Sequence, residues 1–326
     1  MNKIRTAFAA AAACGVMVLS ACGGSGGGGT EAVAPDGSLE KTQITVGVLP
    51  LADYGAVYWA NENGLFEKEG LEVTLEPIQG GPIGIQKVAS GELDYAIANT
   101  ISASISQAQG APVTDVAYTA SLGNGSGAIF VKPDSPIQTI DDLNGKTVGT
   151  NTTRNIGDVT FANLARSEGK KVSPNWVEVP FPEMVSGVQA GSIDAGYTPE
   201  PFWSAAQQAG MRRVVDLTNG PNAGLAASIF VAGNRFVGQN PDTTAAFARA
   251  IYAAGGEMAA DEQAVRNWIP SVAKVPADVA QTMVMPTYSS GMDVAALEKV
   301  SNMLKEQGLI PADFDISDHV YQLPTD

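Results

Sequence analysis

The sequence predicts an α/β protein built from two similar lobes. From Pro82 to Val131 the chain repeats itself at an offset of 100 residues, without a gap and with identical residues at ten positions. This period is far too long for a solenoid, whose repeats span about 20 to 50 residues. Apolar stretches also alternate with helical patterns, which is typical of the α/β class. The matched positions in the first copy are Pro82, Val88, Gly91, Asp94, Ser104, Gln107, Gly110, Ile129, Phe130 and Val131.

Both copies predict the same order of elements. Pro82 and Pro182 favour the first turn of a helix, and Gly91 and Gly191 favour the left-handed residue that ends it. Asp94 and Asp194 follow, and we interpret them as structural, because Asp readily bonds nearby backbone groups. Strands are expected at 44–49, 71–77, 93–98, 113–119, 146–150 and 193–197, and helices at 56–63, 243–258, 262–269, 278–284 and 294–307.

The repeat also predicts the domain organisation. We expect lobe 1 to comprise residues 42–128 and 230–326 and lobe 2 to comprise residues 129–229, joined by the two Ile-Phe-Val segments. The helices beyond Val231 are expected to pack mainly on lobe 1. Ligands of open α/β sheets bind beyond the carboxyl ends of the strands, so the predicted site lies between the lobes.

The N-terminus predicts export. Lys3 and Arg5 precede an apolar run, and Leu19-Ser20-Ala21-Cys22 resembles a bacterial lipobox. Residues 1–21 are therefore predicted to be a lipoprotein signal peptide, with Cys22 lipidated and residues 22–41 a flexible tether. This places the protein on the extracytoplasmic face of the cell membrane.

Composition excludes several classes of function. The formal net charge is −15, and the charged residues that cleavage before Cys22 would remove, Lys3 and Arg5, are both basic. A nucleic-acid partner is therefore not expected. Cys14 and Cys22 are the two cysteines and His319 is the one histidine. Cysteine catalysis, a Ser-His-Asp site and a multi-histidine metal site are thus disfavoured, and neither a cofactor nor a metal is predicted.

Several segments resemble a known family. They are the lipobox, Ala60 to Leu71 (ANENGLFEKEGL), Gly91-Glu92-Leu93-Asp94, the segment 141–149 and Pro199-Glu200-Pro201-Phe202. Over about residues 43–235 the chain resembles the solute-binding proteins of nitrate, sulfonate and taurine importers, in a superfamily that includes pyrimidine-precursor binders. The resemblance implies a type II periplasmic-binding-protein fold and a receptor that delivers cargo to an ABC permease and its ATPase. Its fungal synthase branch carries a cysteine-rich motif and an essential histidine, which this chain lacks.

Candidate ligand-binding residues stand at the predicted strand ends. Arg154 follows hydroxyl side chains where a strand gives way to a helix, a set that suits a small oxyanion, although Thr152 could equally cap that helix. Glu200 would instead favour a cationic or hydrogen-bond-donating ligand. The candidates are Asp53, Tyr54, Gln79, Gly80, Asn99, Thr100, Thr152, Thr153, Arg154, Asn155, Glu200 and Trp203.

The sequence therefore predicts a binding protein rather than an enzyme. We expect a monomer that captures a sulfonate, nitrate, carboxylate or related small molecule between its lobes. A pyrimidine or thiamine precursor is the alternative ligand class, and an enzyme on the same scaffold is a further alternative.

Overall fold

The computed structural model describes residues 38–324. The predicted signal peptide, Cys22 and most of the predicted tether lie outside the described residues. The last residues of that tether are attached to the folded body. The Glu40 carboxylate accepts hydrogen bonds from the backbone N–H groups of Asp242 (3.1 Å) and Thr243 (2.9 Å), and Lys41 Nζ pairs with Asp94 at 2.6 Å. Glu40 thereby meets the first turn of a helix, where a carboxylate is favoured.

The first sheet is mixed. Its strands lie in the order β11-β4-β10-β3-β1-β2. The strand β1 pairs in parallel with β2 and β3, whereas β10 runs antiparallel to β3 and β4. The strands are β1 (Gln43–Val48), β2 (Glu72–Pro77), β3 (Tyr95–Asn99), β4 (Val113–Ser121), β10 (Ala226–Gly233) and β11 (Thr287–Tyr288).

The second sheet repeats this plan in the order β7-β6-β8-β5-β9. The strand β6 is parallel to β7 and β8, and β5 is antiparallel to β8 and β9. The two sheets confirm the predicted two-lobed α/β fold. The strands are β5 (Gly127–Val131), β6 (Thr147–Thr150), β7 (Asn175–Glu178), β8 (Ala195–Pro199) and β9 (Arg212–Asp216).

The two Ile-Phe-Val segments are exchanged strands. The first lies in β5 of the second sheet, and the other lies in β10 of the first sheet. The chain therefore changes sheets at residues 122–126 and 217–225, just before these segments. Their residues are fully buried, so the apolar sequence reflects a central strand rather than the crossing itself.

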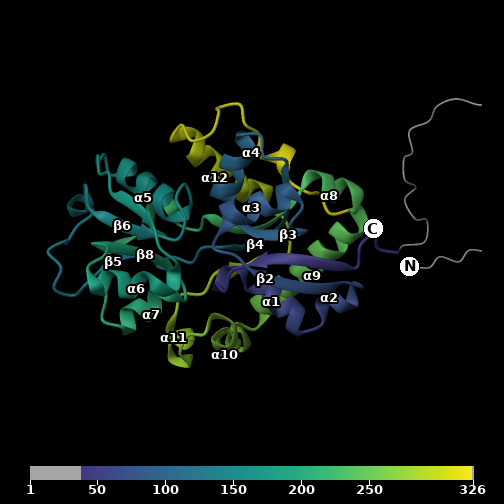
Figure 1. The fold of residues 1–326 in the computed structure, drawn as a ribbon, viewed down its shortest axis with the longest axis horizontal. Helices are drawn as coiled ribbons and strands as arrows, with labels where there is room; N and C mark the ends of the chain where they lie inside the picture. The colour runs from purple at the N-terminus through teal and green to yellow at the C-terminus, as the bar shows by residue number, and fades with distance from the viewer. Residues whose placement is uncertain (1–37, 325–326) are drawn as a thin grey trace, which may run out of the picture. The chain divides into compact units, whose positions relative to one another are not determined.

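Helices flank both sheets (Figure 1). Those between strands are α1 (Gly55–Glu62), α2 (Leu65–Lys68), α3 (Gly81–Ser90), α4 (Thr100–Ala108), α5 (Ile156–Ser167), α6 (Phe181–Ala190) and α7 (Phe202–Gln208). Those after β10 are α8 (Asn234–Gln239), α9 (Pro241–Ala260), α10 (Glu262–Ala273), α11 (Ala277–Thr282) and α12 (Val294–Glu306). Short 3-10 turns occupy Ala52–Tyr54, Asp141–Leu143, Gly220–Asn222 and Ile316–His319.

The C-terminal helices pack mostly on the lobe of the first sheet, as expected. The helix α9 packs on α1 and β4, and α12 packs on α4. The helix α11 differs, because it contacts α7 of the other lobe, and Figure 1 shows it beside that helix. The segment from α10 to β11 is thus a further link between the lobes.

The repeated aspartates are structural, as predicted. Asp94 Oδ2 accepts a hydrogen bond from Thr45 N, and Asp194 Oδ2 accepts one from Thr147 N, both at 2.8 Å. Each carboxylate thus ties the start of one strand to the beginning of its parallel neighbour. Gly91 and Gly191 end the preceding helices with φ of 79° and 74°. Within residues 38–324, none of the helices has both the length and the apolar character of a membrane span.

Candidate ligand-binding site

A cavity lies between the two lobes, at the strand ends that the repeat places opposite each other. Its volume is about 30 Å³, enough for one or two water molecules. Any larger ligand therefore requires the lobes to move apart. The cavity is lined by Leu49, Leu51, Asp53, Tyr54, Gly80, Gly81, Ile97, Asn99, Leu122, Asn151, Asn155, Ile156, Phe181, Tyr197 and Pro199.

Asp53 is the ionisable carboxyl group in this lining. It lies in the 3-10 turn after β1, and Ser228 Oγ of β10 donates a hydrogen bond to its Oδ2. Burial raises the pKa of Asp53 to about 6, although the Ser228 hydrogen bond opposes the shift. Lysine and arginine are absent from the residues that line the cavity. The charged group available to a solute is therefore an acceptor of hydrogen bonds.

Three asparagines surround the cavity, and much of their donor capacity is already used. Asn99 Nδ2 donates to Asn155 Oδ1, and Asn155 Nδ2 donates to Thr152 Oγ1. Asn151 Nδ2 approaches Gln79 O at 3.4 Å, whereas Asn151 Oδ1 is buried without a hydrogen-bond partner in the described structure. A buried unsatisfied oxygen favours a donor. The cavity thus combines two acceptor groups, Asp53 and Asn151.

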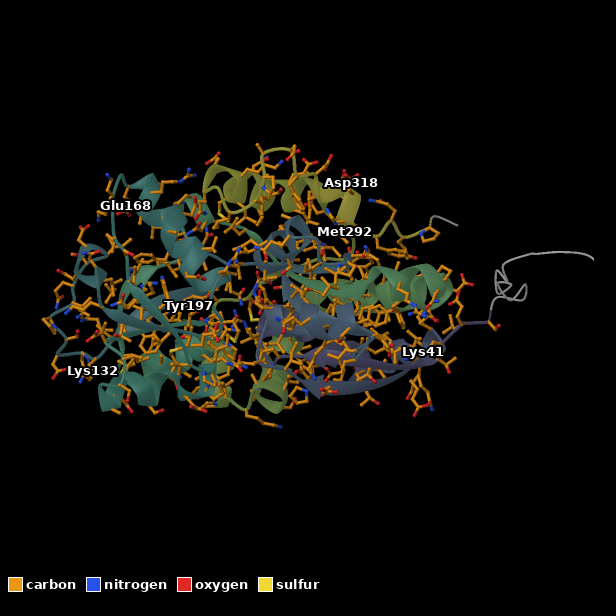
Figure 2. The ribbon with its side chains drawn as sticks, turned by 45° about the horizontal axis from the view of Figure 1, so that its top comes forward. Lys41, Lys132, Glu168, Tyr197, Met292 and Asp318 are labelled. Atoms are coloured by element: carbon orange, nitrogen blue, oxygen red, sulfur yellow. The ribbon has the colours of Figure 1, made fainter. Side chains whose placement is uncertain are left out.

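Aromatic rings form its walls. Tyr54 is buried, and its hydroxyl donates to Ala98 O at 2.8 Å. Tyr197, labelled in Figure 2, comes from β8 and packs edge-on against Phe181, with ring centroids 6.2 Å apart. These rings provide apolar surface beside the acceptors, which is the usual composition of a small-molecule site.

The lobes touch directly beside the cavity. Gln79 Nε2 lies 3.4 Å from Asn151 O, which is the reciprocal of the Asn151 contact with Gln79 O. Gly80 makes this approach possible, since a Cβ there would lie 2.9 Å from Asn151 Nδ2 and 3.1 Å from Thr152 Cγ2. With φ of 172°, Gly80 has an extended backbone that any residue can adopt.

Gly80→Ala should therefore obstruct closure without straining the chain. Overpacking of about 1 to 3 kcal/mol in the closed form should weaken solute binding roughly five- to hundredfold. Titration calorimetry would measure this, with urea unfolding as the check on stability. Gly238→Ala on α8 is the matched control, because no atom lies within 4 Å of its added Cβ. Equal affinities in both variants would contradict this role of Gly80.

The turn at Thr152 to Asn155 does not present its amides to the cavity. Thr153 N donates to Glu178 Oε1 at 2.8 Å, and Arg154 N donates to Asp158 Oδ2 at 2.7 Å. Asn155 and Asp158 form a capping box at the start of α5. Two carboxylates thus occupy donors that an oxyanion would need.

The Arg154 side chain is exposed and lies outside the cavity lining. With the Gln109 amide oriented to fit its neighbours, its oxygen accepts hydrogen bonds from Nη1 (3.3 Å) and Nη2 (2.7 Å) of Arg154. Arg154 therefore links the lobes from outside the cavity.

Other predicted residues serve packing. Thr100 Oγ1 donates to Ala226 O at 2.5 Å, and the buried Trp203 ring stacks on Phe130 at 6.2 Å. Glu200 is buried and accepts hydrogen bonds from Ser204 N (3.0 Å), Ser204 Oγ (2.8 Å) and Val284 N (3.1 Å). Burial raises the pKa of Glu200, and these hydrogen bonds oppose the shift. Its carboxylate fastens the segment after α11 to lobe 2.

Glu200→Ala should lower stability by about 2 to 4 kcal/mol, because it leaves a buried hydroxyl and two backbone N–H groups without their acceptor. Urea unfolding would measure the loss. Glu200→Gln retains one acceptor oxygen and should lose less. A change below about 0.5 kcal/mol in the alanine variant would show that this contact does not hold the segment.

The structure brings together Asp53, Tyr54, Gly80, Asn99 and Asn155 in the cavity lining, and it places Gln79 and Thr152 beside it. Thr100, Thr153, Arg154, Glu200 and Trp203 are not in the lining. A ligand role for any of these residues stays a prediction. Sequence reasoning missed Asn151 and Tyr197. Asn151 follows the strand β6 directly, so its position is a usable signal, whereas nothing distinguishes Tyr197 from an ordinary strand residue.

Comparison with known proteins agrees with this architecture. The family model described as NMT1/THI5 like matches residues 52–264, more than half of the chain. The protein belongs to the NMT1/THI5-like family. The curated relatives of this family member include the 4-amino-5-hydroxymethyl-2-methylpyrimidine phosphate synthase of Schizosaccharomyces pombe. That protein is 23% identical over 278 residues, covering 79% of each chain.

Solved structures show that this NMT1/THI5-like protein has the periplasmic-binding-protein fold. The alkanesulfonate-binding protein SsuA of Xanthomonas axonopodis pv. citri, bound to MOPS, superimposes with a TM-score of 0.70 at 19% identity. The match covers 87% of this chain and 99% of SsuA. The periplasmic nitrate-binding protein NrtA of Synechocystis also gives 0.70, at 15% identity over 87% of each chain.

Proposed function

We propose that this protein is the extracytoplasmic solute-binding component of an ABC importer. The observation that carries the proposal is the cavity between two lobes of repeated plan, each of which contributes polar side chains from its strand ends. A solute that contacts both lobes stabilises the closed arrangement. The closed form would then present the cargo to a membrane permease with its ATPase, and lipidated Cys22 would keep the receptor at the membrane.

The proposed ligand is a small molecule that donates hydrogen bonds, such as an aminopyrimidine. Asp53 and Asn151 accept hydrogen bonds, the walls are aromatic, and no lysine or arginine is part of the lining. This ligand class differs from the small oxyanion that the sequence of residues 152–155 favours. An oxyanion in this cavity would face the Asp53 carboxylate without a compensating cation. The S. pombe relative is named for a pyrimidine, which supports the same ligand class.

Binding without turnover is the proposed activity. The side chains of the lining include neither a cysteine nor a histidine. His319, which could serve as a proton carrier, stacks on Phe314 near the C-terminus. The polar groups that remain can hold and orient a solute, and Ser228, the serine bonded to Asp53, is not part of the lining. Mass spectrometry of a bound probe after prolonged incubation should therefore recover it unchanged.

A thermal-shift screen tests the ligand class. Sulfonates, nitrate, carboxylates and aminopyrimidines would each be added to the purified protein, because binding to the folded state raises the melting temperature. Stabilisation by aminopyrimidines is expected, and stabilisation by oxyanions alone would contradict the proposed ligand. Small-angle scattering should show different radii of gyration with and without saturating ligand, whereas an unchanged profile would contradict movement of the lobes.

A further inference from the structure

A second, larger chamber lies next to the cavity. Its volume is about 300 Å³, and most of its lining is apolar. The side chains of Leu49, Ile78, Phe181 and Phe202 contribute to it together with three prolines, and Gln79 is the polar residue of the lining. Because a cavity of about 150 Å³ is large enough to bind benzene, this chamber has room for a substituted ring.

The chamber and the cavity share a wall. Leu49 and Phe181 line both of them. The Phe181 ring stacks on Phe202 of the outer chamber, with centroids 5.8 Å apart and planes at 25°, and meets Tyr197 of the inner cavity edge-on. Phe181 therefore stands between an inner space that contains the acceptors Asp53 and Asn151 and an outer space lined mainly by apolar groups.

Both lobes build the outer chamber. Leu49 and Ile78 follow strands of the first sheet, whereas Phe181 and Phe202 begin α6 and α7 of the other lobe. The Phe202 and Leu49 side chains are only half-buried, so they expose apolar surface to solvent at this position. A group that filled the chamber would bury surface on both lobes and would favour closure.

We propose that the outer chamber is a second subsite, which binds an apolar, ring-sized extension of the same solute. This inference rests on the proposed function, because the extension needs a hydrogen-bonding head held by Asp53 and Asn151. The solute would thus be amphipathic. The lobes would part to admit its donor-bearing head to the inner cavity, and its apolar group would lie beyond Phe181. Selectivity for the head would come from the inner acceptors, and much of the affinity would come from the outer chamber.

A matched pair of probes tests the second subsite. The probes are 4-amino-2-methylpyrimidine and the same molecule with a benzyl group at carbon 5, titrated calorimetrically into the full-length protein. In the unmodified protein the benzyl probe should bind roughly tenfold or more tightly than its parent, because it buries additional apolar surface. Phe202→Ala should reduce this affinity ratio toward one, and Phe202→Leu should retain part of it.

Phe236→Ala on α8 is the control for a lost phenyl ring, because Phe236 packs on Tyr95 and lines neither the cavity nor the outer chamber. It should keep the affinity ratio of the unmodified protein. If the parent probe binds and depends on Asp53 while the benzyl group adds no affinity, the second subsite is overturned and the proposed function stands. If Phe202→Ala leaves the ratio unchanged, the second subsite is likewise overturned. If neither probe binds, or if binding is indifferent to Asp53→Asn, the proposed ligand class fails and the inference fails with it.

Discussion

Asp53→Asn should weaken binding of 4-amino-2-methylpyrimidine by roughly ten- to hundredfold at pH 7.5. The reason is that the variant loses a charged acceptor, and hydrogen bonds to charged groups contribute about 1.5 to 3 kcal/mol. Titration calorimetry would measure the two affinities. Glu183→Gln is the matched control, because it removes the same charge from an exposed side chain at the start of α6. The folded state should tolerate Asp53→Asn, since burial disfavours the charge that the variant removes.

The same residue should make binding dependent on pH. Because the pKa of Asp53 is raised to about 6, the carboxylate becomes protonated as the pH falls below that value and loses its negative charge. The affinity of the unmodified protein relative to Asp53→Asn should therefore decrease from pH 7.5 to pH 5. The comparison needs a probe that does not itself titrate between pH 5 and pH 7.5, because a protonated aminopyrimidine would pair with the carboxylate. A constant ratio across this range, or equal affinities at pH 7.5, would exclude Asp53 from the site.

Asp115→Asn should stabilise the protein at neutral pH by about 2 to 4 kcal/mol. Asp115 lies in β4 with no exposed surface, and burial raises its pKa to about 7, although a hydrogen bond from Gln107 Nε2 (2.8 Å) opposes the shift. A pKa difference of about three from the unfolded chain corresponds to about 4 kcal/mol. Asp115 Oδ2 and Gln107 Oε1 are both buried without partners in the described structure, so the new amide could donate where the carboxylate cannot.

The sign of the pH dependence follows from the raised pKa. Between about pH 4 and pH 7 the folded state keeps a proton on Asp115 that the unfolded chain has released, so stability should fall as the pH rises through this window. Urea unfolding at pH 5 and pH 8 would show this loss in the unmodified protein and a smaller one in Asp115→Asn. Asp134→Asn is the control, because Asp134 is exposed. Asp194→Asn would not serve, because Asp194 accepts a hydrogen bond from Thr147 N. An equal pH dependence in the unmodified protein and Asp115→Asn would contradict a neutral Asp115.

Local signals predicted much of the fold. The proline and glycine pair around 82–91 and its copy at 182–191 gave helices that begin and end close to the expected residues. The apolar periodicity beyond Val231 likewise predicted α9, α10 and α12, because the buried face of an amphipathic helix repeats apolar residues at helical spacing. The role of the Ile-Phe-Val segments could not be read in the same way. The sequence of a fully buried strand does not indicate which of the two sheets the strand joins.

The candidate site was predictable as a region, but its chemistry was not. Asp53, Gly80 and Asn99 stand at strand ends, and the chain alone indicated that those ends would meet. From the sequence, Arg154 suits an anion because its neighbours are hydroxyls and amides. The structure shows that Glu178 and Asp158 already accept hydrogen bonds from the backbone amides of this turn. Glu178 belongs to β7, whereas the turn follows β6. From the sequence, Glu200 favours a cationic or hydrogen-bond-donating ligand, yet the partners of its carboxylate include the distant Val284.

The sequence by itself determined the doubled α/β plan, the acidic character of the protein and the strand ends at which its two halves meet. The tertiary structure alone decided which polar groups remain available to a solute. The physical reason is that a hydrogen-bond donor or a charge is available only if no other residue has satisfied it. In this protein the residues that do so, such as Glu178 for Thr153 and Gln109 for Arg154, come from separate elements that only folding brings together.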